Sequence, residues 1–145
     1  MQPLFSYAPP SRFTDLWLLI FRVLTGGLMM FNHGLSKWGK LTSGEEIQFA
    51  DPFGIGPAAS LTLTVFAEVA CSALLMLGLF SRLATVPLII TMLVAIFSAH
   101  AGQPFQKMEL ALVYLLMLVT IFVFGPGRHS LDAVITRRLF QQHRI

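Results

Sequence analysis

Ionisable side chains occur inside apolar segments of this 145-residue sequence. Such a group costs several kcal/mol in a membrane-spanning helix, so it marks a functional site by default. Glu68 is the deepest, about ten residues into the apolar segment that begins at Ala58, which corresponds to roughly 15 Å of helix. That depth is close to the middle of a bilayer. A carboxylate there must be paired, solvated or protonated.

Arg22 is the natural partner for Glu68, because its long side chain can reach toward the middle of the membrane. One interpretation is a structural salt bridge that determines how two helices pack. The other is a carboxylate that anchors a ligand or carries a proton. The residues leave both open, together with a cavity-facing Glu68 that has no role.

A second set of ionisable residues falls at a similar depth near the outer membrane face. It comprises His33, Lys37, His100, Lys107 and Glu109. Neutral histidine donates and accepts hydrogen bonds, and its ordinary pKa suits proton transfer near pH 7. The set could hold the polar head of an amphipathic ligand whose tail lies among the helices. It could equally consist of interfacial residues solvated by headgroups and water.

Two histidines on different segments also raise a haem or metal site as a minor alternative. His33 and His100 could be axial ligands of a b-type haem, and Glu109 would complete a metal site. Neither a Glu-x-x-His pair nor an H-x-x-x-H spacing supports it. Cys71 is the only cysteine, so an intrachain disulfide is excluded.

Four apolar segments must position these residues, at about 15–38, 58–80, 83–99 and 108–124. Their lengths suit helices that cross lipid, and none shows the alternation of a barrel strand. Charged residues make up 12% of the chain, about half the share in soluble domains. We therefore predict an all-α polytopic membrane protein, a single domain over 1–145 with four transmembrane helices in a bundle.

The first two segments carry polar faces. The first has a stripe of residues three or four apart, formed by Arg22, Gly26, Met29, His33 and Lys37. Gly26 lets another helix approach closely, so the stripe should face the bundle. The second segment has a polar strip that recurs every fourth residue, formed by Ser60, Thr64, Glu68 and Ser72.

Two short helices are expected at the membrane surface. Ser43-Gly44-Glu45-Glu46 fits a capping box, which predicts a helix in the first outer loop that ends at Asp51-Pro52. Ser130 should cap a final helix over about 130–141, whose apolar face lies along the cytoplasmic interface.

Positive charge predicts the orientation in the membrane. The N-terminus, the second connection and the C-terminus carry Arg12, Arg82, Arg128, Arg137, Arg138 and Arg144. The other side carries Lys37, Lys40 and Lys107. Six against three places both termini in the cytoplasm. The basic residues form no single stripe, so nucleic acid is excluded as a partner.

Several of these residues lie in runs that resemble the DoxX family of small bacterial membrane proteins. The resemblance rests on Arg22, Gly26, Phe31-x-His33-Gly34-x-x-Lys37, Glu68, Leu77-Gly78-Leu79-Phe80-Ser81-Arg82 and Gly125-Pro126-Gly127-Arg128-His129-Ser130-Leu131-Asp132. It extends from Trp17 to about Asp132. The resemblance implies a four-helix fold in the bacterial inner membrane.

Members of that family are linked to a quinone-dependent thiosulfate oxidoreductase and to membrane oxidoreductase complexes. The resemblance thus implies a redox-associated subunit, dependent on a redox-enzyme or membrane-protein partner, that holds a quinone or similar lipophilic ligand. Arg22 and Glu68 would form the floor of its pocket, and His33, Lys37, His100 and Glu109 the mouth. A homo-oligomer also fits.

Two other functions remain open. One is a non-enzymatic assembly or scaffolding subunit for membrane proteins. The other is a small-molecule transporter, which is supported by the carboxylate at mid-membrane depth and by a faint repeat of the Phe31–Gly34 segment at Phe97–Gly102.

Overall fold

The computed structural model describes residues 12–142, with side chains through residue 139. All regular elements in this part of the chain are helical, which confirms the all-α prediction. In chain order they are α1 (Arg12–Met29), η1 (Met30–Gly34), α2 (Leu35–Thr42), α3 (Pro57–Val65), η2 (Phe66–Cys71), α4 (Ser72–Leu77), α5 (Ser81–Val94), η3 (Ala95–Ala99), α6 (Phe105–Phe124) and α7 (Leu131–Gln142). The η elements are π-helical turns.

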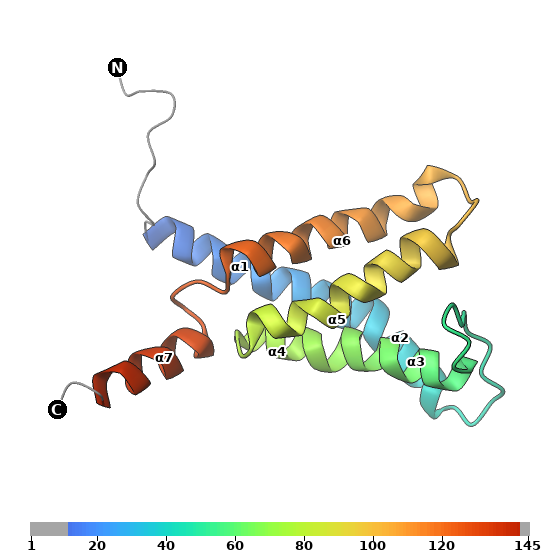
Figure 1. Cartoon of the computed structure of the whole chain (residues 1–145), viewed down its shortest axis with the longest axis horizontal. Coiled ribbons are helices and arrows are strands. Elements are labelled where there is room, and N and C mark those ends of the chain that lie inside the picture. The colour runs from blue at the N-terminus through green and yellow to red at the C-terminus, as the bar shows by residue number, and fades with distance from the viewer. Residues whose placement is uncertain (1–11, 143–145) are drawn as a thin grey trace, which may run out of the picture.

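All of these elements except α7 join into four continuous helical spans (Figure 1). Each span is long and apolar enough to cross a membrane, as predicted. The spans are Arg12–Thr42, Pro57–Leu77, Ser81–Ala99 and Phe105–Phe124. The first span is longer at both ends than the apolar segment 15–38 from which it was predicted. Leu75, Leu88 and Leu118, one each from the second, third and fourth spans, are fully buried in the common core.

The first and second spans pack closely because two glycines face the second span. A Cβ atom on Gly34 would lie 2.8 Å from the carbonyl oxygen of Glu68, and one on Gly26 would lie 2.9 Å from that of Ser72. Only glycine tolerates these backbone contacts. The stripe that begins at Arg22 therefore faces the bundle, as predicted; its members are buried or partly buried.

Arg22 closes the end of the bundle where the second and fourth spans finish. Its side chain is 2% exposed. Nη1 donates to the carbonyl oxygen of Pro126 over 3.2 Å and Nη2 to that of His129 over 3.0 Å. The guanidinium packs so tightly on Gly78, whose φ is +71°, that any Cβ there would overlap it.

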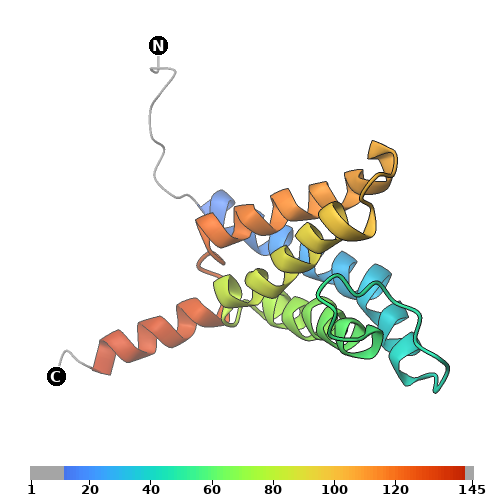
Figure 2. The same ribbon diagram turned by 45° about the vertical axis from the view of Figure 1, so that its right-hand side comes forward.

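Helix α7 is tied to the same end through Asp132. The Asp132 carboxylate accepts the backbone N–H groups of Phe80 and Ser81, over 2.7 and 2.9 Å, and so caps the start of α5. Ser130 in turn caps α7, because its hydroxyl accepts the N–H of Ala133. The predicted final helix is thus present, and it projects away from the bundle in Figure 2.

The apolar face of α7 is exposed along its length, at Leu131, Val134, Ile135 and Leu139. Its location at the cytoplasmic interface stays a prediction. Arg144, which contributed to the predicted orientation, lies outside the described residues.

The helix predicted in the first outer loop is wrong, because residues 43–56 contain no helix. Ser43 ends a helix instead of starting one: its hydroxyl donates to the carbonyl oxygen of Lys40 in α2. Gly44 follows with φ of +76°, the left-handed conformation that terminates helices. The serine–glycine pair follows a helix instead of preceding one, because the first span continues to Thr42.

The close packing at Gly34 gives a stability prediction. Gly34→Ala should lower the free energy of unfolding by about 1–3 kcal/mol. The added methyl group would overlap the backbone at Glu68, which can shift only by disturbing the packing of the second span. Gly39→Ala is the matched control in the same span, with nothing within 4 Å of the added Cβ. Thermal unfolding in detergent should show a lower Tm for Gly34→Ala alone; equal Tm values would contradict the packing argument.

Candidate functional site

A cavity of about 390 Å³ lies among the four spans, within the range of about 300–1,000 Å³ usual for small-molecule sites. Every span contributes to its wall, and so does the loop between the first and second spans (residues 43–56). Its basic and acidic lining residues are His33, Lys37, Glu68, His100 and Lys107. The rest of the wall is largely apolar. A cavity of this kind can hold a molecule with both polar and apolar parts.

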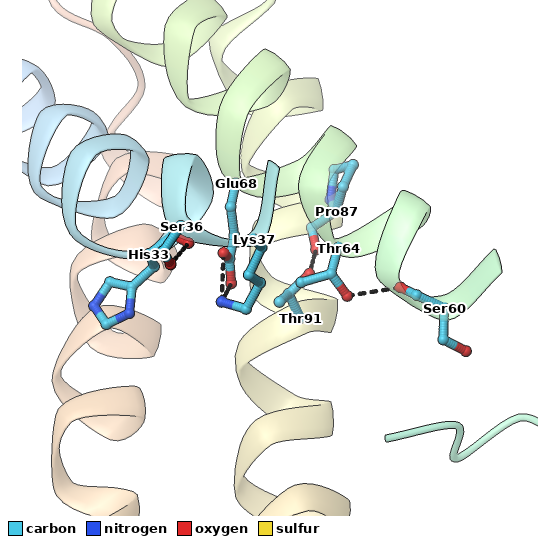
Figure 3. Close-up of polar contacts among 8 residues, drawn as sticks. All are labelled: His33, Ser36, Lys37, Ser60, Thr64, Glu68, Pro87 and Thr91. Atoms are coloured by element: carbon cyan, nitrogen blue, oxygen red, sulfur yellow. Dashed lines mark hydrogen bonds and ion pairs between the residues drawn. The ribbon is translucent and has the colours of Figure 1, made fainter. Parts of the chain in front are cut away.

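Glu68 is paired with Lys37 across the first and second spans (Figure 3). The Lys37 ammonium lies 2.8 Å from Oε1 and 2.6 Å from Oε2. The Glu68 side chain is 3% exposed and that of Lys37 23% exposed. Burial strengthens the attraction between the two charges while desolvation opposes it, and it makes the loss of either partner costly.

Lys37, and not Arg22, is thus the cation that neutralises Glu68. The reason is axial position: Arg22 contacts Gly78, and about ten residues, or roughly 15 Å of helix, separate Gly78 from Glu68. The first span does supply a cation for Glu68, as expected. That cation is Lys37, which lies at the other end of the stripe from Arg22.

His33 lines the cavity beside Tyr114 of the fourth span. The two rings meet edge to face, with centroids 5.5 Å apart and an interplanar angle of 89°. Tyr114 is buried, and His33 is partly buried. This contact orients the imidazole at the cavity wall and links the first span to the fourth.

His100 lines the cavity just after η3. Its Nδ1 lies 2.7 Å from the carbonyl oxygen of Ala95. A carbonyl oxygen only accepts, so in a neutral ring this contact requires the proton on Nδ1 and leaves a lone pair on Nε2. His100 can therefore accept a hydrogen bond from a ligand.

Three π-helical turns surround the cavity. His33 lies in η1, Glu68 lies in η2, and His100 follows η3 directly. A π-turn inserts an extra residue into a helix, and such turns occur frequently at functional sites. The regular spacing of the polar residues indicated α-helix throughout and held no signal of these turns.

The structure does not bring all six predicted site residues together. His33, Lys37, Glu68 and His100 line the cavity, whereas Arg22 and Glu109 do not. Arg22 lies in the polar network at the opposite end, and Glu109 is exposed on α6. Among the described residues no group of three or more histidine, cysteine or acidic side chains could hold a metal, so His33, His100 and Glu109 form no such cluster.

The loop between the first and second spans adds residues that sequence reasoning did not place in the site. Phe49 and Ala50 line the cavity. Asp51 holds the adjoining loop in place: Oδ1 accepts the Ser60 hydroxyl over 2.7 Å, and Oδ2 accepts the Gly56 N–H over 2.7 Å. These bonds, that of Ser60 first and those of the backbone after it, lower the pKa of Asp51 although desolvation opposes them.

The fold and cavity define a small membrane protein with four helical spans and a polar pocket between them. The chain belongs to the DoxX family, whose model matches residues 17–101. It is similar to an uncharacterized protein of Haemophilus influenzae, with 31% identity over 74% of this chain and 76% of the relative.

An uncharacterized membrane protein of Mycobacterium tuberculosis is also similar, with 29% identity over 93% of this chain and 87% of that protein. No solved structure matches the chain significantly. These comparisons assign the family and the membrane class, and they name no ligand or reaction.

The Lys37–Glu68 pair predicts a non-additive response to mutation. Lys37→Met should lower the free energy of unfolding by about 3 kcal/mol, because it leaves a buried carboxylate without a cation. Adding Glu68→Gln should restore much of that loss, since the unpaired charge is then removed. Denaturation of the single and double variants in detergent measures both effects. Strictly additive losses would show that the two side chains do not act as a pair.

The loop attachment at Asp51 predicts a pH dependence. Because the folded-state pKa of Asp51 is lowered, its stabilising effect is complete above the unfolded-state pKa and is lost as pH falls through the folded value. The amides of Ile55 and Gly56 should therefore lose protection from hydrogen exchange only below about pH 4. Asp51→Ala should expose both amides at every pH; unchanged protection in this variant would refute the role of the carboxylate.

Proposed function

We propose that the protein binds a quinone or similar lipophilic ligand in the cavity and serves as the ligand-holding subunit of a membrane redox complex. The observation that carries the proposal is a buried Lys37–Glu68 pair with two histidines in the wall of a cavity among membrane spans. Ionisable groups are rarely placed at such depth without a functional or structural need.

The cavity groups match the chemistry of a quinone. Its carbonyl oxygens accept hydrogen bonds, which Lys37 and a protonated ring nitrogen of His33 can donate. Reduction to the quinol takes up two electrons and two protons. The electrons would come from a partner redox enzyme and the two protons from water, and His33 or Glu68 would take up these protons and pass them to the quinone oxygens.

The membrane arrangement supports this assignment. With both termini in the cytoplasm of a bacterial inner membrane, as the charge distribution predicts, the cavity lies in the outer half of the bilayer. A lipophilic ligand would reach it from the hydrocarbon region. A soluble redox partner would then approach from the outer face, where the first outer loop lies.

A binding experiment tests the proposal. A short-chain quinone should bind the purified protein, and His33→Gln and Glu68→Gln should each weaken binding by about tenfold or more, because each removes a hydrogen bond or charge at the polar head. Glu109→Gln is the control, since that residue is exposed and outside the cavity. Titration calorimetry in detergent gives the affinities, and Tm values verify folding.

Equal quinone affinity in the wild type, His33→Gln and Glu68→Gln would refute the proposed quinone site. A protein that binds no quinone but co-purifies with another membrane protein would instead favour the assembly-subunit function.

A further inference from the structure

A second cavity of about 290 Å³ adjoins the first, between the second and third spans and under the first outer loop. The two cavities have five lining residues in common: Phe49, Ala50, Thr64, Thr91 and Val94. They are therefore neighbouring compartments of one hollow region. Alone, the second lies at the lower limit of small-molecule sites, about 300 Å³.

The second cavity offers a ligand almost no polar chemistry. No charged side chain occurs among the described residues that line it. Its three hydroxyl groups already donate within the protein, Ser60 to Asp51, Thr64 to the carbonyl oxygen of Ser60 and Thr91 to that of Pro87, as Figure 3 shows for the two threonines. Hydrocarbon is the matching occupant, because it leaves no hydrogen bond unmade.

The second cavity also borders the outer surface of the bundle. Leu63 and Phe66 from the second span and Ile90 from the third line it, and each is about half exposed. In a membrane-spanning bundle these exposed apolar side chains face lipid. The second cavity thus lies between the bilayer and the polar cavity.

We propose that the second cavity holds the apolar tail of the ligand whose polar head lies in the first cavity. The ligand enters from the bilayer between α3 and α5, and Phe49 and Ala50 cover the junction where head and tail meet. This inference rests on the proposed function and specifies its substrate class: a quinone with an alkyl or isoprenoid tail.

The test compares two quinones with the same head, one with a decyl tail and the other the short-chain quinone of the binding experiment above. The tailed quinone should bind the wild-type protein at least about tenfold more tightly, because burial of each methylene group is favourable. Ile90→Trp should remove that advantage by filling the second cavity while short-chain binding is unchanged. Leu93→Trp is the matched control, on the same helix, exposed and outside both cavities.

Titration calorimetry at one detergent concentration keeps partition of the tail into micelles equal for all three proteins. The tail compartment is overturned if Ile90→Trp binds the tailed quinone as wild type does, or loses no more affinity than Leu93→Trp. Binding of the short-chain quinone to wild type would then still uphold the proposed function. Failure of both quinones to bind wild type overturns the two proposals together.

Discussion

The structure depends on the need of one buried carboxylate for a cation. Glu68 is 3% exposed in the second span, and in a medium of low dielectric it must be neutralised. Lys37 reaches it only because Gly34 brings the first span into contact with the backbone at Glu68. The charge pair and the glycine contact thus lie side by side, and both join the first span to the second.

A second polar network closes the opposite end of the bundle. Arg22 donates to carbonyl oxygens of the turn after the fourth span, and Asp132 accepts the free N–H groups at the start of the third. The Asp132 contacts satisfy N–H groups that the start of a helix would otherwise leave unpaired. The bundle therefore carries polar links at two levels, with buried leucines between them. The cavity lies at the level where three helices change to π-turns.

The hollow region near Glu68 consists of a polar compartment and an apolar compartment that adjoin each other. Lysines and histidines line the compartment among all four spans, whereas hydrocarbon dominates the compartment that borders lipid. A membrane-soluble molecule with a polar head and an apolar tail matches the order of these compartments, with its tail toward lipid and its head toward Lys37. The loop over residues 43–56, held by Asp51 to Ser60, lines both compartments and so belongs to the site as much as the spans do.

The sequence by itself determined the four apolar spans, their helical nature and the burial of the Arg22–Lys37 stripe, because hydropathy and periodicity depend on neighbours along the chain. It also identified five ionisable residues that line the cavity: His33, Lys37, Glu68, His100 and Lys107. Only the tertiary structure decided that Glu68 pairs with Lys37, since that choice depends on how far one helix is shifted along another. The same holds for the π-turns and for Ser43, whose role as a helix end follows from the length of the packed first span.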